Sequence, residues 1–189
     1  MRVSSAAFSD LDDLADLWVE LAADQRAFGS HLRADANRTP IREALARHVA
    51  ADGVLVAREG QENGATGETS GDGGGGDGGG AEDVEDAEAG DIVGFVMFDI
   101  EAGAYEQDAT RGMIRNLFVR PVYRDAGVGA QLLAAAETAL GDAGADTVAL
   151  DVLADNDAAR RFYRRHGYRP HRVELEKSMR NDTHSKEDR

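Results

Sequence analysis

The chain has 189 residues, with 21 Lys and Arg against 36 Asp and Glu, and its formal net charge is −15. This length suits one domain with a single sizeable core. The lack of cysteine excludes disulfides, thiolate catalysis and zinc-thiolate sites, and the acidic balance argues against a nucleic-acid partner. No apolar run approaches the roughly 18 residues of a membrane span, so we expect a cytoplasmic protein with no membrane partner.

The N-terminal part predicts a strand followed by two helices. Residues 2–8 can form the strand. Ser9 then caps a helix, with Asp12 three residues on as in a capping box, and leucines at helical spacing give that helix a buried stripe. Thr39-Pro40 begins the second helix, because Thr suits the N-cap and Pro the first helical position.

A low-complexity segment over residues 60–90 interrupts the chain. It contains nine acidic residues and no Lys or Arg, and Val84 is its only large apolar residue, so we expect it to be disordered. It separates strands predicted over 54–58 and 92–101, which can form a hairpin. Closing a longer flexible loop costs only about 0.6 kcal/mol per doubling of its length, so the fold tolerates the insertion.

The C-terminal part alternates strands and helices. The predicted elements are a strand over 113–119, a helix over 128–140, a strand over 147–153, a helix over 157–166 and a last strand near 173–179. This order predicts an α/β protein with a central mixed β-sheet and helices on both faces. We expect a single domain over residues 1–180 and a polar tail over 181–189.

The most informative stretch is Leu117 to Ala130, LFVRPVYRDAGVGA, in which a strand runs through a glycine turn into a helix. Gly127 and Gly129 carry no Cβ, so a bulky anion can approach the main chain. The amides at the start of the helix favour phosphate, and Arg124 adds a fixed positive charge.

A second motif lies thirty residues further on. Leu150 to Tyr168 reads LDVLADNDAARRFYRRHGY, a strand, a polar break, a short helix and a Gly-Tyr stop. The spacing R-x-x-G-x-G after the first strand and N-x-x-A-x-x-x-Y-x-x-x-G-Y after the second resembles the GNAT superfamily of N-acetyltransferases. The resemblance covers residues 91–179. It implies the acyl-CoA N-acyltransferase fold, in which two central parallel strands, here 113–119 and 147–153, splay apart to admit the cofactor.

The resemblance also implies the residues that bind acetyl-CoA, the acyl donor. The pantetheine-binding residues are Leu117, Phe118 and Val119, the pyrophosphate-binding residues are Arg124, Asp125, Ala126, Gly127, Val128, Gly129 and Ala130, and the further amide ligand is Asn156. Asp155 or Asn156 can also simply cap the following helix, and capping and binding are compatible.

The catalytic residues are less completely specified. Tyr163 matches the family tyrosine that protonates the departing thiolate. Many family members carry a Glu as base where this chain has Arg115, which cannot accept a proton. Asp151 lies where some relatives place a catalytic Glu, although a strand-end Asp can equally be a structural acceptor. Asp99 and Glu101 are weaker alternatives for the base.

The predicted function is transfer of an acetyl group to a primary amine of a small molecule, a protein N-terminus or a lysine. An alternative is a non-catalytic acyl-CoA-binding regulatory module, which Arg115 in place of Glu favours. A nucleotide-binding regulator lacks support, because the sequence has neither an acidic residue placed to bind a nucleotide ribose nor a magnesium-binding motif. The five histidines show no metal-ligand spacing, so no metal is expected. We expect a monomer or homodimer, and the few lysines with surplus Asp resemble proteins of salt-loving archaea.

Overall fold

A computed structural model describes residues 1–60, 90–102 and 107–179. The chain divides into two compact units, Met1–Leu153 and a smaller one that begins at Ala154. The predicted insertion and tail lie outside the described residues, apart from the two ends of the insertion. The single domain predicted from the sequence stays a prediction. No helix within the described ranges is long and apolar enough to cross a membrane.

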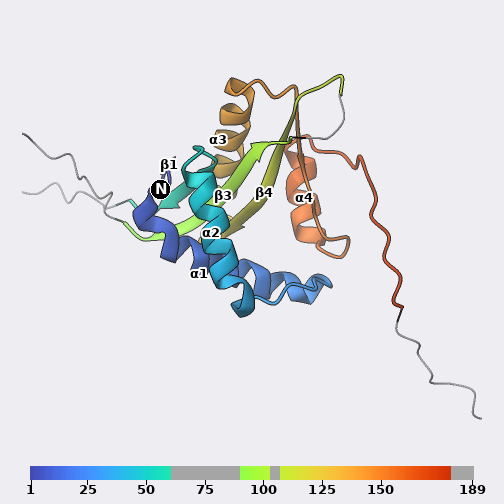
Figure 1. Cartoon of the computed structure of the whole chain (residues 1–189), viewed down its shortest axis with the longest axis horizontal. Helices are drawn as coiled ribbons and strands as arrows, with labels where there is room; N and C mark the ends of the chain where they lie inside the picture. Colours follow the sequence, from blue (N-terminus) through green and yellow to red (C-terminus); the bar gives the residue numbers. More distant parts are fainter. Residues whose placement is uncertain (61–89, 103–106, 180–189) are drawn as a thin grey trace, which may run out of the picture. The chain divides into compact units, whose positions relative to one another are not determined.

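The first unit is built on a five-stranded sheet in the order β1-β2-β3-β4-β5 (Figure 1). The strands are β1 (Arg2–Ser5), β2 (Val54–Arg58), β3 (Ile92–Ile100), β4 (Arg111–Val119) and β5 (Thr147–Leu150). The first four pair antiparallel, and β5 pairs parallel to β4. The predicted mixed sheet is therefore confirmed, as is the hairpin of β2 and β3 on either side of the insertion.

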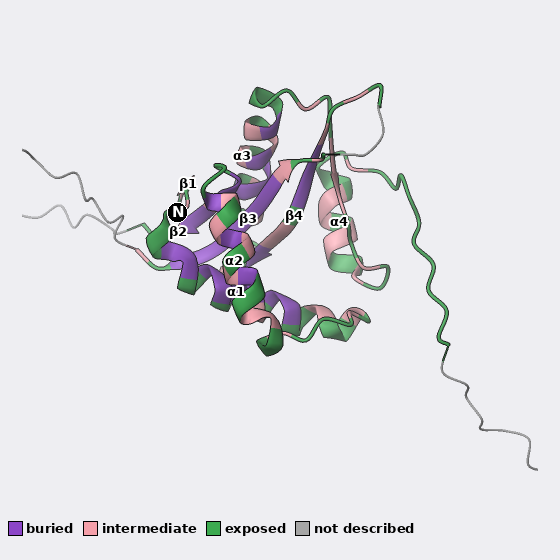
Figure 2. Ribbon diagram, viewed as in Figure 1, coloured by how far each residue is buried: buried purple, intermediate pink, exposed green. Residues whose placement is uncertain are grey.

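Helices cover both faces of this sheet, as predicted. They are α1 (Leu11–Gln25) and α2 (Arg38–Val49), which pack together on one face, and α3 (Val128–Asp142). In β3, Phe95 and Met97 join the core formed with α1 and α2. Successive side chains of a strand point to opposite faces, so the buried Val96 and Phe98 face the other side, where α3 packs on β3 and β4. In the ribbon of Figure 2 the buried residues are coloured purple, and much of β3 and β4 has this colour.

The approach to α1 differs from the sequence prediction, which made Ser9 the helix cap. Residues Phe8–Asp10 form a 3-10 turn, and the carboxylate of Asp10 accepts the Ala7 N–H at 2.8 Å. The same carboxylate pairs with Arg58 of β2 at 2.7 Å, and Asp10 is only 7% exposed. The side chain of Arg58, which is 12% exposed, draws Asp10 inward, so the cap forms around Asp10 instead of Ser9. Other 3-10 turns span Arg26–Phe28, Asp35–Asn37 and Pro121–Tyr123.

The second unit contains α4 (Asp157–Arg165), one residue shorter than predicted. The predicted strand near residues 173–179 is wrong, because the described residues after 168 form neither helix nor strand. Val173, Leu175 and Met179 are 80%, 89% and 85% exposed. Their sequence has the apolar alternation of a strand, but such alternation gives a strand only where a neighbouring strand pairs with it.

The buried ion pair between Asp10 and Arg58 should matter for stability. Loss of one partner of a fully buried pair costs about 3–5 kcal/mol. Arg58 keeps a hydrogen bond to the Gly90 carbonyl at 3.3 Å, so we expect Asp10→Ala to lower the free energy of unfolding by no more than that amount in denaturant titrations. Asp12→Ala is the matched control, because Asp12 pairs with Arg42 on the exposed surface at 2.8 Å and should change stability little. Equal effects of the two substitutions would mean that the buried pair stabilises the fold no more than a surface pair does.

Candidate functional site

The pairing between β4 and β5 ends early. It joins only Arg111 through Ile114 to Thr147 through Leu150, although β4 continues to Val119. The Arg120 N–H donates to the Val93 carbonyl on β3 at 2.9 Å. Because backbone groups alternate along a strand, those of Leu117 and Val119 then face away from β3, toward the side that β5 has left. The predicted opening between the two strands is present, and β5 is three residues shorter than expected.

Arg124 folds back onto this open edge. Its Nε donates to the Val119 carbonyl at 2.9 Å, and its other end pairs with Asp24 of α1 at 2.9 Å. The guanidinium carbon also lies 5.6 Å from the centre of the Phe118 ring. The arginine predicted for pyrophosphate binding therefore has protein partners in the free chain.

The glycine turn leads directly into α3. Asp125 and Gly127 have positive φ angles of 62° and 80°, and α3 begins at Val128, as predicted. The first N–H groups of a helix have no partner within it, so the amides after Gly127 are free of intrahelical bonds. A Cβ at Gly127 would meet no atom within 4 Å, so the turn is open as well as glycine-dependent. This backbone fits an anionic group such as a pyrophosphate.

A bulge in β4 sets the position of Arg115. Met97 pairs with Asn116 and Phe98 pairs with Ile114, so Arg115 is the extra residue between them. Its Nε donates to Asp99 of β3 at 3.0 Å and its NH2 group at 2.9 Å. Where the family commonly has a carboxylate base, this chain has a guanidinium bound to a neighbouring carboxylate.

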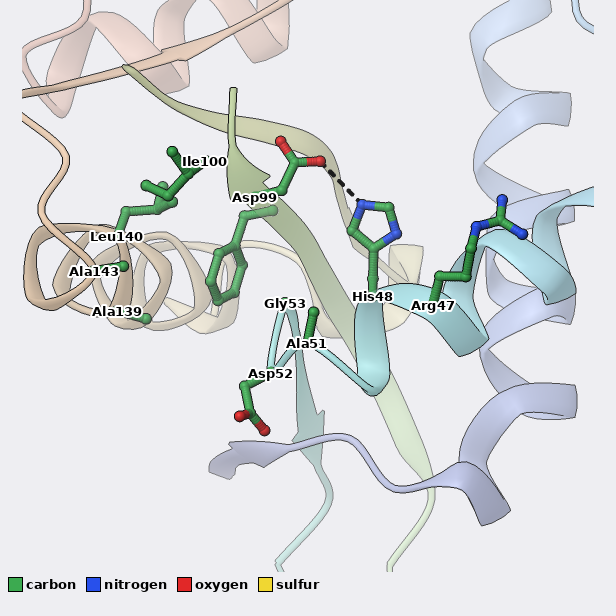
Figure 3. Close-up of a pocket in the computed structure, with 11 residues that line it drawn as sticks. Arg47, His48, Ala51, Asp52, Gly53, Asp99, Ile100, Ala139, Leu140 and Ala143 are labelled. Atoms are coloured by element: carbon green, nitrogen blue, oxygen red, sulfur yellow. Dashed lines mark hydrogen bonds and ion pairs between the residues drawn. The ribbon is translucent and has the colours of Figure 1, made fainter. Parts of the chain in front are cut away.

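His48 of α2 completes this cluster, and sequence reasoning missed it. Its Nε2 lies 3.0 Å from one oxygen of Asp99 (Figure 3). Its Nδ1 lies 2.9 Å from the Ala44 carbonyl oxygen. Fifty-one residues separate His48 from Asp99, and no sequence motif links them. His48 and Asp99 line a cavity of about 370 Å³. The end of α2 and the turn after it, Phe98 and Ile100 of β3, and the end of α3 form the rest of its lining.

The two weaker candidates for the base are both engaged. Burial tends to raise the pKa of Asp99, but hydrogen bonds from Arg115 and His48 outweigh it and hold this pKa below its ordinary value. Glu101 pairs with Arg111 at 3.0 Å. A carboxylate that is held in an ion pair is a poor proton acceptor.

Asp151 has a different environment. It is exposed and directly follows β5, and within the described residues its carboxylate has no hydrogen bond or ion pair. Asp151 nevertheless affects Arg115 of β4. The hydrogen bond to Asp99 raises the pKa of Arg115, and the negative charges of Glu101 and Asp151 raise it further. In the described part of the chain, no group of three acidic or histidine side chains could hold a metal ion.

The second unit holds the other two predicted site residues. Asn156 is the N-cap of α4, and its side-chain oxygen accepts the Ala159 N–H at 3.0 Å. The ring of Tyr163 lies edge-on to those of Phe162 and Tyr168, with centroids 5.2 Å and 5.7 Å away. Burial raises the pKa of Tyr163 to about 12, so its hydroxyl keeps its proton at any physiological pH.

Comparison with known proteins agrees with this geometry. Residues 78–168 match the acetyltransferase (GNAT) family. The GNAT match ends at Tyr168, the last residue of the second sequence motif. The five-stranded mixed sheet is that of the GNAT acyltransferase fold, as the sequence predicted. No curated protein sequence matches the chain.

Solved structures share the GNAT fold at low sequence identity. A tetramutant of the BH1408 protein from Bacillus halodurans is 19% identical, with a TM-score of 0.68 over 95% of this chain and 100% of that one. A GCN5-related N-acetyltransferase from Ralstonia eutropha is 19% identical, with a TM-score of 0.64 over 94% and 97% of the two chains. An aminoglycoside N-acetyltransferase in complex with CoA is 15% identical, with a TM-score of 0.58 over 94% and 98%.

The raised pKa of Tyr163 can be measured directly. The chain has four tyrosines, so the titration of this one is isolated by subtracting the ultraviolet absorbance of Tyr163→Phe from that of the unsubstituted protein. We expect the difference to titrate at about pH 12, because burial disfavours the phenolate. A midpoint near the ordinary tyrosine value of about 10 would show that the phenol is solvated.

Proposed function

We propose that this protein is an acetyl-CoA-dependent N-acetyltransferase that acetylates a primary amine. The observation that carries the proposal is the opening of β4 after Ile114, immediately before a glycine turn at the start of α3. An unpaired strand edge suits an amide-rich chain, and a helix N-terminus suits a phosphate. A molecule that has both, in that order, is an acyl-CoA.

The residues present fit this acyl donor. The backbone groups of Leu117 and Val119 would bind the pantetheine arm as an added strand would. The turn from Arg124 to Ala130 would bind the pyrophosphate through main-chain amides and the guanidinium. Asn156 would add an amide contact, and it can do so while capping α4 because its second polar atom is not used in the cap.

The reaction needs a neutral amine and an acid for the leaving group. The amine nitrogen attacks the thioester carbonyl, so a C–N bond forms, the C–S bond breaks, and the amine loses one proton. Asp151 would accept that proton directly or through a water molecule, because its carboxylate is exposed beside the opening of the strands. Tyr163 would give its proton to the departing thiolate, since its raised pKa keeps the hydroxyl protonated.

A second candidate function is a non-catalytic acyl-CoA-binding regulator. The ion pair between Arg115 and Asp99 favours it, because the common position of the base carries a guanidinium that is already paired. A structure described as a transcriptional regulator from Bacillus halodurans shares the fold at 16% identity, with a TM-score of 0.61 over 94% of this chain and 99% of that one. Release of free thiol from acetyl-CoA in the presence of an amine panel separates the two functions.

The glycine turn should control coenzyme affinity. We expect Gly129→Val to weaken acetyl-CoA binding at least tenfold in titration calorimetry, because the branched side chain would crowd the amides that face the phosphates. Gly141→Val is the matched control, since Gly141 lies in the same helix and a Cβ there would meet nothing within 4 Å. Wild-type affinity in a folded Gly129→Val protein would rule out this assignment.

Substitutions of Tyr163 and of Asp151 should reduce the rate of acetyl transfer in different ways. Tyr163→Phe keeps the ring, so acetyl-CoA should bind nearly normally while kcat falls by about 10²- to 10⁴-fold, as for loss of a general acid. Asp151→Asn should reduce the rate most on the acid side of the pH profile, where the amine is protonated, and recover partly at high pH. The measurement is the pH dependence of kcat for both variants, with coenzyme affinity measured separately.

Two results would contradict these roles. Unchanged kcat in Tyr163→Phe would remove the tyrosine as the acid. An unchanged pH profile in Asp151→Asn would make that carboxylate structural and leave water as the base.

A further inference from the structure

Arg115 has donor capacity that the protein does not use. A guanidinium has five N–H donors, and here the edge formed by Nε and NH2 donates to Asp99. Within the described residues, no hydrogen bond or ion pair involves NH1 of Arg115, and the side chain is 38% exposed. The outer edge, formed by NH1 and the second N–H of NH2, is therefore available to a planar anion such as a carboxylate.

The rest of the cluster holds this edge in place. Asp99 accepts from Arg115 on both oxygens and lies within hydrogen-bond distance of His48 on one. The other nitrogen of His48 is anchored at the Ala44 carbonyl of the same helix. A guanidinium fixed in this way loses little side-chain entropy when it binds a ligand, so a contact to its free edge is favourable.

The register of the sheet places an opposite charge beside Arg115. The last pair that joins β4 and β5 is Ile114 with Leu150, so Arg115 and Asp151 are the next residues along the two strands. Neighbouring strands lie about 4.8 Å apart, and the two chains begin to separate at this point. The charge of Asp151 makes the smallest of the contributions that raise the pKa of Arg115, and no ion pair joins the two side chains within the described residues. The point where β4 and β5 separate, called the mouth of the opening below, thus has the guanidinium of Arg115 on one strand and the carboxylate of Asp151 on the other.

Arg115 and Asp151 lie where the acetyl group of a bound acetyl-CoA is expected. If the pyrophosphate lies at the glycine turn and the pantetheine follows the edge of β4 from Val119 toward Leu117, the thioester end continues toward Arg115. An acceptor amine must reach the same place. Groups that flank this mouth therefore contact the part of the acceptor adjacent to its reactive nitrogen.

Building on the proposed N-acetyltransferase activity, we propose that the acceptor is a zwitterion of the α-amino acid type, whose carboxylate binds the free edge of Arg115 while its amine lies at Asp151. In an α-amino acid a single carbon joins these two groups, so one small molecule can meet both charges. Arg115 is then a specificity-determining residue, and the replacement of the common carboxylate by a guanidinium selects the acceptor. Asp99 and His48 are positioning residues for it.

The test compares acceptors that differ only in the carboxylate. Each standard L-amino acid, its carboxamide and the corresponding decarboxylated amine are offered with acetyl-CoA, and kcat/KM is measured for each. We expect amino acids to be preferred over their carboxamides by at least tenfold. In Arg115→Met that preference should fall to about one through loss of the amino acid reaction, with the carboxamide rate little changed.

Two further variants make the result specific. Arg111→Met is the matched control, because Arg111 is on the same strand and pairs with Glu101 at 3.0 Å, so the preference for the carboxylate should be kept. His48→Gln should raise KM for the amino acid with a smaller effect on kcat, as expected for a residue that only positions the guanidinium. Equal turnover of amino acids and carboxamides, or a preference unchanged by Arg115→Met, would overturn the inference while leaving the N-acetyltransferase activity intact.

If no amine is acetylated, the proposed function is overturned. Ligand binding then tests the zwitterion site separately. Amino acids and carboxamides are then titrated calorimetrically into the protein saturated with coenzyme A. Carboxylate-dependent binding that is lost in Arg115→Met supports the zwitterion site, and failure of every amino acid to bind overturns it.

Discussion

The early end of the pairing between β4 and β5 is the constraint on which the site depends. Two parallel strands that stayed paired to their ends would bury the backbone groups of Leu117 and Val119 in the sheet. Because the pairing stops after Ile114 and Leu150, β4 keeps one paired edge and one open edge over its second half. A 3-10 turn over Pro121–Tyr123 joins the open edge to the glycine turn, so neighbouring segments supply the amide-binding and the phosphate-binding parts of the proposed donor site.

The bulge at Arg115 lies at the same point along β4. One extra residue there brings the guanidinium beside Asp99, and α2 contributes His48 to the same carboxylate. Arg115 and His48 occupy the oxygens of Asp99, and Arg111 pairs with Glu101, so Asp151 is the remaining carboxylate among the candidates for the base. In the proposed reaction, a guanidinium in place of the common carboxylate would change two things together, the choice of base and the charge presented to the acceptor.

Much of this could be predicted from sequence because it rests on local pattern. The strand over 54–58, the start of α3 at Val128 and the glycine turn follow from apolar periodicity and from residues with special backbone freedom. The cap at Asp10 could not be predicted, since it depends on Arg58, 48 residues away. His48 was missed for the same reason. The strand near 173–179 was overpredicted because the alternation of apolar residues fits the two faces of a strand but does not provide the neighbouring strand with which it must pair.

The bulge also explains why the partner of Arg115 was missed. Counting alternate residues along a regular hairpin assigns cross-strand pairs, and a single inserted residue shifts every pair beyond it by one. The halophilic character inferred from composition and the disorder of the acidic insertion remain predictions. Both concern solvent and mobility, and neither is needed to account for the sheet or the site.

The ion pair between Arg124 and Asp24 gives the free protein its own counter-ion at the turn that we propose binds phosphate. A polyanion that binds the Nε and NH2 groups of Arg124 would displace the Asp24 carboxylate as well as water, and it would also release the Val119 carbonyl from the same side chain. Dissolved salt screens this internal pair as well as the pair with the incoming ligand, because the side chains of Arg124 and Asp24 are 47% and 48% exposed. The two effects oppose each other. Ligand binding at this turn is therefore less sensitive to ionic strength than the arginine's charge alone would suggest.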